Sequence, residues 1–113
     1  MKYLMLVAAD PDHSAEDEAR APTIEAWFDQ VSASGARIMG ERLRPTTDAT
    51  TVRVRGGELL ITDGPFTESR EWIAGFDILE CADLDAAIEI AASHPMAYMG
   101  RLELRPFWPM DEN

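Results

Sequence analysis

Residues 59–76 read LLITDGPFTESREWIAGF, and this stretch decides which fold the chain is expected to adopt. An apolar strand runs into the turn sequence Asp-Gly-Pro-Phe at 63–66, and a second strand begins about seven residues later. Asp-Gly or Gly-Pro alone is enough to form a turn. Charged residues nevertheless crowd the connection, namely Glu68, Arg70 and Glu71. We therefore expect a polar site here in addition to a turn.

Hydrophobic periodicity on both sides of this stretch indicates alternating strands and helices. Strands are expected at 2–8, 36–43, 52–55, 58–62, 73–80 and 98–105. Gly56-Gly57 is typical of a two-residue hairpin turn between the third and fourth of these strands. The acidic segment 9–22 is expected to be a solvated loop with, at most, a short helical turn.

A first helix is predicted at 23–34. Thr23 can cap its start, and Gly35 can adopt the left-handed conformation at its end. Four apolar residues share one stripe of this helix and are expected in the core: Ile24, Trp27, Phe28 and Val31.

A second helix is predicted from Asp83, a good capping residue, to His94, because Pro95 disfavours helical geometry in its predecessor. Its buried stripe is expected to contain Leu84, Ala87, Ile88 and Ala91.

Without the hairpin, the element order is strand-helix-strand-strand-helix-strand, which is the ferredoxin-like α+β arrangement with an antiparallel sheet. Two helices can cover only one face of such a sheet. The open face needs a partner, and a second copy of the chain is the simplest one. We therefore predict a homodimer formed through the open sheet face.

Length and composition limit the classes of function. A chain of 113 residues fits one domain, 1–113, and its net charge of −11 argues against binding to nucleic acid or to an anionic membrane. No apolar run reaches the roughly 20 residues of a membrane helix. A single cysteine, Cys81, excludes an internal disulfide and favours a reducing, cytoplasmic location.

Several short motifs occur in a fixed order along nearly the whole chain: 40–45 (GERLRP), 50–53 (TTVR), 63–66 (DGPF) with Glu68, Arg70 and Glu71, 83–87 (DLDAA) and 104–106 (LRP). In this order the chain resembles the DGPF-domain, YCII-related family. The resemblance implies a ferredoxin-like sheet that pairs into a dimeric α+β barrel. Most such proteins have no established activity, and some are encoded beside extracytoplasmic-function sigma factors.

The same resemblance implies a specific pair of catalytic residues that this chain does not carry. The wider superfamily includes isomerases and a dehydrochlorinase of aromatic degradation. YCII proteins are thought to use a His on the first helix and an Asp immediately before a Pro after the second. Here these positions fall near Ile24 and at His94, so the His–Asp pair is not carried over.

The polar segment 63–71, which connects the two strands, contains the first set of candidate residues. Asp63, Glu68 and Glu71 could raise one another's pKa and transfer protons, with Arg70 or Arg42 holding an anionic substrate. The alternative is structural, with Asp63 capping the turn and the glutamates pairing with arginines.

Three further residues are candidates because of their positions. His94 follows a helix, where the dipole favours an imidazolium and a structural role competes with that of a general base. Trp72 could line a pocket or lie in the dimer interface. Asp77 shares a strand face with Ile73, Gly75 and Leu79, and it would point into a ligand cavity if that face closes the barrel.

Two functional hypotheses remain open. The first is a cofactor-independent acid/base enzyme, of isomerase or lyase type, acting on a small anionic or cyclic substrate, with Asp63 and His94 transferring protons in a shared cavity. The second is a non-catalytic module that binds a small ligand or has a regulatory role, for example in a sigma-factor system. Phosphate-binding glycine loops, Ser-His-Asp spacing and Cys-x-x-Cys pairs are absent from the sequence, so no cofactor or metal is expected.

Overall fold

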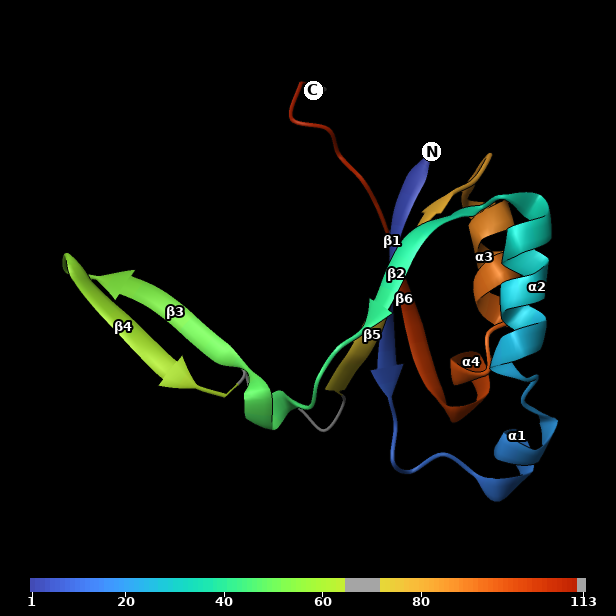
Figure 1. Cartoon of the computed structure of the whole chain (residues 1–113), viewed down its shortest axis with the longest axis horizontal. Coiled ribbons are helices and arrows are strands. Elements are labelled where there is room, and N and C mark those ends of the chain that lie inside the picture. The colour runs from blue at the N-terminus through green and yellow to red at the C-terminus, as the bar shows by residue number, and fades with distance from the viewer. Residues whose placement is uncertain (65–71, 112–113) are drawn as a thin grey trace.

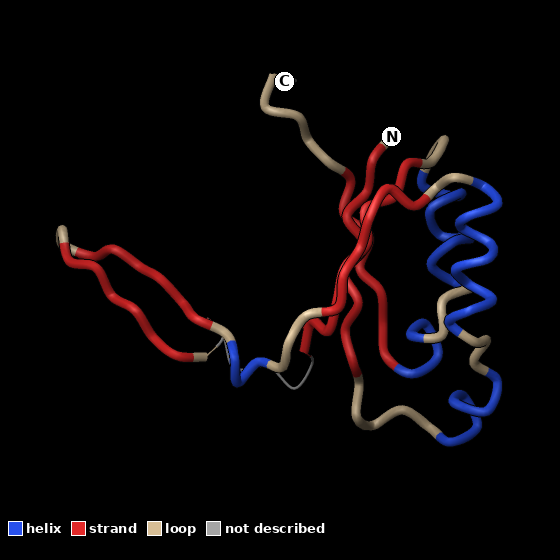
Figure 2. The backbone as a smooth tube through the Cα atoms, in the orientation of Figure 1, coloured by secondary structure: helices blue, strands red, loops and turns tan. Residues whose placement is uncertain are grey.

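The computed structural model describes residues 1–64 and 72–111, and of Trp72 it describes the backbone alone. Its centre is an antiparallel four-stranded sheet with the strand order β2-β5-β1-β6 (Figures 1 and 2). The strands are β1 (Lys2–Ala9), β2 (Arg37–Arg42), β5 (Trp72–Glu80) and β6 (Gly100–Pro106). This sheet confirms the predicted ferredoxin-like α+β fold.

The remaining elements are helices on the main body and a separate hairpin. The helices are α1 (Ala15–Arg20), α2 (Ile24–Ser34), α3 (Leu84–Ala92) and α4 (Met96–Met99), and a 3-10 turn, η1, spans Thr46–Asp48. The hairpin consists of β3 (Thr50–Arg55) and β4 (Glu58–Asp63), which form a two-stranded sheet of their own. No described helix is long and apolar enough to cross a membrane.

The predicted caps of α2 and α3 are confirmed. The Thr23 hydroxyl accepts a hydrogen bond from the Ala26 amide at 3.1 Å, and Asp83 Oδ1 accepts one from the Ala86 amide at 2.9 Å. Gly35 ends α2 with φ of 69°, in the left-handed region that a glycine enters without strain. Local sequence therefore defines where both long helices begin.

The segment after α3 differs from the prediction. The chain turns at Pro95 and starts a new short helix, α4, before β6 begins at Gly100. Proline is compatible with a helix start because the missing N–H has no intrahelical partner there. The short helix α4 therefore places His94 between two helices, and not at a free helix end.

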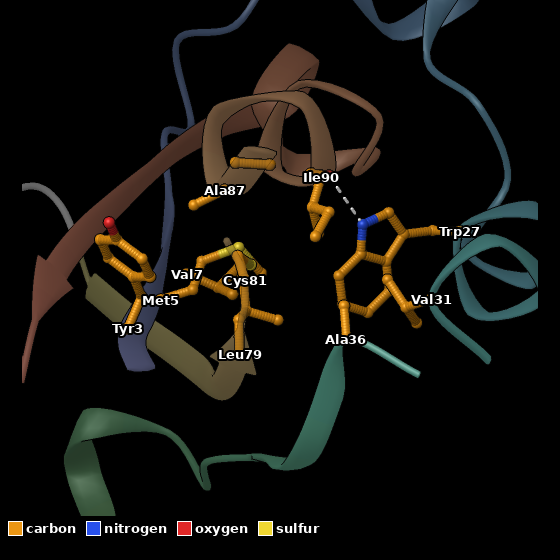
Figure 3. Close-up of a cluster of buried hydrophobic side chains, with 11 residues drawn as sticks. Tyr3, Met5, Val7, Trp27, Val31, Ala36, Leu79, Cys81, Ala87 and Ile90 are labelled. Carbon is orange, nitrogen blue, oxygen red and sulfur yellow. Dashed lines mark hydrogen bonds between the residues drawn. The ribbon is translucent and has the colours of Figure 1, made fainter. Parts of the chain in front are cut away.

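The core lies between the sheet and the pair α2 and α3, which cover one face (Figure 1). Met5, Leu79, Trp27 and Val31 are its largest fully buried side chains. Figure 3 shows the Trp27 indole N–H donating to the Ile90 carbonyl at 2.9 Å. This bond links α2 to α3 and satisfies a polar group that would be costly to bury alone.

Three residues expected in the core are substantially exposed. Leu84 and Ile88 are 49% and 48% exposed, and Ile90, together with Ala87 and Ala91, takes their place against the sheet. Phe28 is 42% exposed and lines a cavity instead. In both helices the apolar stripe is wider than the surface that the sheet can cover, so its margin remains accessible.

A β-bulge in β5 changes which residues share a face. Val7 pairs with Gly75, whereas Ala8 pairs with Ile73, so Ala74 is the extra residue. One extra residue shifts the side-chain alternation. Ile73 therefore lies with Ala8 on the opposite face from Gly75, Asp77 and Leu79, and the predicted grouping of all four is wrong.

No helix of the described residues covers the second face of the sheet (Figure 1). By strand register this open sheet face contains the apolar residues Leu4, Leu6, Ala8, Met39, Ile73, Phe76 and Ile78, with Glu41 on β2 and Arg101, Glu103 and Arg105 on β6. Most of its apolar residues are half-buried, whereas Met39 and Ile73 are 43% and 47% exposed. The face is thus an apolar surface with charged residues on both edge strands.

Candidate active site

A cavity of about 660 Å³ lies between α2, the β2–β5 side of the sheet and the segment that joins α3 to α4. Its walls include the aromatic rings of Trp27 and Phe28. The charged or titratable residues in the lining are Arg37, Glu41, Arg42, Asp77 and His94, of which Glu41 lies by strand register on the opposite face of the sheet from Asp77. A mainly apolar cavity with a few convergent polar groups is the usual form of a small-molecule site.

Asp77 and Arg37 form the polar centre of this cavity. Arg37 Nε donates to Asp77 Oδ1 at 2.7 Å, and Arg37 Nη2 donates to the Gly40 carbonyl at 3.0 Å. The guanidinium also lies 5.2 Å from the centre of the Phe28 ring, within the range of a cation–π interaction. Arg37 is thereby fixed in orientation on three sides.

Burial determines the electrostatics of Asp77, which is only 6% exposed. Removal from water raises the pKa of its carboxyl group, and the hydrogen bond and charge of Arg37 oppose this rise. The net direction is upward. A carboxylate with a raised pKa is a stronger base than an exposed one, which suits proton transfer.

Gly40 makes the approach of the two strands possible at this point. It pairs directly with Asp77 across β2 and β5. A Cβ atom at residue 40 would collide with the Asp77 carboxylate and the Phe76 carbonyl oxygen. Glycine is therefore needed here for space, since the carboxylate occupies the position of a side chain.

His94 lies against Trp27 in an edge-on contact, with the ring centres 4.7 Å apart. Its Nδ1 accepts a hydrogen bond from the Met96 amide at 2.9 Å, so in the neutral ring the proton is on Nε2. The side chain is 6% exposed, and burial lowers its pKa to about 4. His94 is therefore a neutral hydrogen-bond donor at neutral pH.

This result corrects the expectation that the helix dipole would favour an imidazolium at His94. A dipole at a helix end is worth up to about 2 kcal/mol, whereas desolvation of a buried charge costs more. The Trp27 ring and α4 exclude water from the imidazole. Burial consequently decides its protonation state.

Arg42 is the exposed cation of the lining, at the end of β2. Among the described residues, no hydrogen bond or ion pair engages its guanidinium, in contrast to that of Arg37. Its planar fork of donors fits a carboxylate or a phenolate oxygen. Arg42 is thus the group best placed to hold an anionic ligand.

The structure brings together Arg42, Asp77 and His94 of the predicted site residues. Asp63 is exposed at the end of β4 and does not line the cavity, so the expected meeting of Asp63 with His94 does not occur in this chain. The physical reason is the hairpin, which forms a separate sheet and holds Asp63 away from the helices (Figure 1). Glu68, Arg70, Glu71 and the Trp72 side chain lie outside the described residues.

Sequence reasoning missed Arg37, Phe28 and Gly40 as parts of the site. The only signal was Asp77 itself, a carboxylate within an apolar strand that required a partner. Its partner is 40 positions away in sequence, on a strand whose pairing was not known in advance. In the described part of the chain, no group of three His, Cys, Asp or Glu residues could hold a metal ion.

Comparisons with known proteins place this geometry in context. The fold is similar to that of 5-chloro-2-hydroxyhydroquinone dehydrochlorinase (TftG) from Burkholderia phenoliruptrix, solved in complex with 2,5-dihydroxybenzoquinone. The TM-score is 0.51 with 100% of both chains covered, and at 12% identity the likeness concerns the fold alone.

A closer sequence relative is an uncharacterized protein, R00369, of Rhizobium meliloti (strain 1021). It is 43% identical over 67 residues, which is 58% of this chain and 54% of the relative, so the match spans about half the length of each protein. The YCII-related domain matches residues 1–111. Because this match covers almost the whole sequence, the chain belongs to the YCII-related family.

Proposed function

We propose that this protein is a cofactor-independent acid/base enzyme, of isomerase or lyase type, acting on a small cyclic or aromatic anion. One observation carries the proposal: a single cavity lined by aromatic residues contains a buried carboxylate, a neutral imidazole and an arginine that no described residue engages. Perturbed pKa values that coincide with a cavity are typical of functional sites.

The cavity favours a flat, partly apolar ligand. Its volume of about 660 Å³ is in the range of small-molecule sites. The Phe28 ring, which is 42% exposed, offers a surface for packing, and Arg42 can bind an anionic oxygen of the ligand. An acyclic, strongly charged metabolite would leave the aromatic walls unused.

The proposed chemistry is proton transfer next to a carbonyl group. The Asp77 carboxylate removes a proton from carbon, and the electron pair moves to the carbonyl oxygen to form an enolate. The Nε2–H of His94 donates a hydrogen bond to that oxygen, as a neutral imidazole can. Return of the same proton to a different carbon completes an isomerisation in which all atoms balance.

The likeness to TftG supports the class of substrate, since the ligand named in that structure, 2,5-dihydroxybenzoquinone, is a small planar ring with ionisable oxygens. Elimination from such a ring needs the same elements, namely a base and a donor to oxygen. We place the protein in the cytoplasm, in keeping with its single, buried cysteine.

A specific contact favours the second hypothesis, a non-catalytic binding module. The 2.7 Å ion pair with Arg37 opposes the rise in the pKa of Asp77 and occupies one of its oxygens. If Asp77 serves only to orient Arg37, the cavity would bind an anion without turnover. Anion binding without turnover would be sufficient for a regulatory role, for example in a sigma-factor system.

The test has a binding step and a chemical step. First, a panel of hydroxybenzoates, dihydroxyquinones and cyclic keto acids is screened by thermal shift, since a ligand raises the melting temperature by mass action. Arg42→Gln should abolish the shift caused by a hit. Arg44→Gln, which changes an arginine outside the cavity lining, should retain it.

Second, each hit is incubated with the protein in D₂O and followed by NMR for deuterium uptake at carbon, and chlorinated hits are followed for chloride release. Catalysis by wild type that falls at least 100-fold in Asp77→Asn and in His94→Asn supports the enzyme. Binding through Arg42 without exchange or release in wild type supports the binding module. A hit whose shift is insensitive to Arg42→Gln rejects this cavity as the site.

A further inference from the structure

The ion pair between Arg37 and Asp77 engages only one oxygen of the carboxylate. Arg37 Nε donates to Asp77 Oδ1 at 2.7 Å. An arginine beside a carboxylate often binds both oxygens through two parallel N–H groups. Here the second group, Nη2, donates instead to the Gly40 carbonyl at 3.0 Å. Among the described residues no other donor reaches the carboxylate, so Oδ2 has no partner from them.

The free oxygen of Asp77 is open to the cavity. Every fully enclosed side-chain oxygen and nitrogen in the described part of the chain has a hydrogen-bond partner. Oδ2 has none from these residues, so it is not fully enclosed, and Asp77 lines the cavity. The carboxylate therefore has one oxygen held by the protein and one that a ligand can reach.

The surroundings of Arg37 hold this arrangement in place. Gly40 lies opposite Asp77 in the β2–β5 register, and Oδ1 occupies the space that a Cβ atom at residue 40 would need. The Phe28 ring packs on the guanidinium, with 5.2 Å from its centre to Cζ of Arg37. These contacts restrict rotation of the guanidinium and, through Oδ1, rotation of the carboxylate.

A purely structural link between the strands explains this geometry less well. β2 and β5 are already joined by backbone pairing along Arg37–Arg42. A buried ion pair adds little net stability, because desolvation offsets the attraction between the charges. The pair of Arg44 with Asp48 has a similar Nε contact, 2.8 Å, but lies outside the cavity with side chains 85% and 44% exposed. It therefore serves as a reference for an ordinary surface pair.

We propose that Arg37 is a positioning residue, which holds Asp77 Oδ1 so that Oδ2 is the atom that removes the proton from the ligand. The inference rests on the proposed acid/base function and names the reacting atom within it. Oδ2 accepts the proton from one carbon and returns it to another, while Arg37 keeps its own protons throughout. The charge of Arg37 also opposes the rise in the pKa of Asp77 that burial causes, which favours the ionised base.

Two substitutions separate orientation from charge. Arg37→Lys keeps the positive charge but lacks the planar fork that reaches Oδ1 and the Gly40 carbonyl together. Arg37→Gln removes the charge as well. Arg44→Lys is the control, because it makes the same change in the surface pair with Asp48.

The kinetic readout is the division of the effect between kcat and KM. The substrate is the member of the panel of hydroxybenzoates, dihydroxyquinones and cyclic keto acids that wild type exchanges fastest in D₂O. Arg37→Lys should lower kcat at least about 10-fold and change KM less than about 3-fold, because a misplaced base slows the chemical step without removing the anion contact. Arg44→Lys should leave both constants unchanged.

The second readout needs no turnover. Carboxyl ¹³C NMR, assigned with Asp77→Asn, gives the pKa of Asp77 in the free protein and reports whether each variant folds. Arg37→Gln should raise this pKa by about one pH unit or more, since the nearby cation lowers it in wild type. Arg37→Lys should leave it nearly unchanged, so that its loss of kcat reflects orientation. The acidic limb of the pH profile of kcat/KM should follow the same order.

The outcomes distinguish this inference from the proposed function. Turnover that is lost in Asp77→Asn but retained in Arg37→Lys overturns the positioning role and leaves the enzyme standing. The same follows if Arg37→Gln does not change the pKa of Asp77. A wild type without turnover on any panel member overturns both proposals. If Arg37→Gln does not fold, Arg37→Lys still decides the question, because it keeps a cation beside the buried carboxylate.

Discussion

The protonation of His94 offers the sharpest test of how the structure controls chemistry in the cavity. Burial lowers its pKa from 6.5 to about 4 in the folded protein, while the unfolded chain retains the ordinary value. Between these pH values the unfolded state binds more protons than the folded state. Acidification therefore favours unfolding, and the stability linked to His94 is lost as the pH falls from about 6.5 towards 4.

The size of the effect follows from the shift. A difference of one pKa unit corresponds to about 1.4 kcal/mol, so full protonation of both states removes about 3 kcal/mol of the free energy of unfolding. By pH 5 the loss relative to pH 7 is about 2 kcal/mol. Asp77 acts in the opposite direction, because a raised carboxyl pKa contributes stability that is lost as the pH rises.

A matched variant separates His94 from all other titrating groups. In His94→Asn the amide oxygen can take the place of Nδ1 as the acceptor for the Met96 N–H, but the side chain cannot titrate. Urea unfolding of both proteins, at one protein concentration, gives the free energy at pH 7 and pH 5. Wild type should lose about 2 kcal/mol more than the variant on acidification. Equal losses would refute a neutral, buried His94.

Three further predictions concern single contacts. Gly40→Ala should destabilise the protein by about 1–3 kcal/mol in urea unfolding, because the new methyl group meets the Asp77 carboxylate; unchanged stability would show that the strands can separate. Asp83→Ala removes the cap of α3 and should lower the free energy of unfolding by about 1 kcal/mol, seen as a melting temperature several degrees lower. Asp83→Asn, which can still cap the helix, should retain most of that stability. Trp27→Phe removes the indole donor to the Ile90 carbonyl, which keeps only the 3.3 Å bond from the Ser93 amide, and should cost about 1 kcal/mol by the same unfolding assay; unchanged stability would show that the indole bond contributes little.

Local signals explain why so much of the fold could be predicted. Thr23, Gly35 and Asp83 act through their own backbone geometry and their nearest amides, so their roles can be inferred without knowledge of the rest of the chain. The Gly56-Gly57 turn has the same property, with both residues at positive φ. Periodicity then indicates which sides of these elements are apolar.

The predictions that failed concern residues whose surroundings are set by segments far apart in the sequence. The bulge at Ala74 places Ile73 on the other face, and the neighbouring Gly75 is an ambiguous signal, because a glycine inside a strand marks either a bulge or a close backbone approach. The helix end predicts a charged His94, but Trp27 and α4 remove the imidazole from water. Both outcomes depend on packing between segments far apart in the sequence.

The order of strands and helices, their caps and turns, and one carboxylate within an apolar strand can all be inferred from sequence, because these features depend on neighbours within a few residues. The contact of Asp77 with Arg37, the neutral state of His94 and the separation of Asp63 from both follow from packing between distant segments. The physical reason is that desolvation and ion pairing depend on which groups the fold brings within a few ångströms, and strand register and helix packing set those distances.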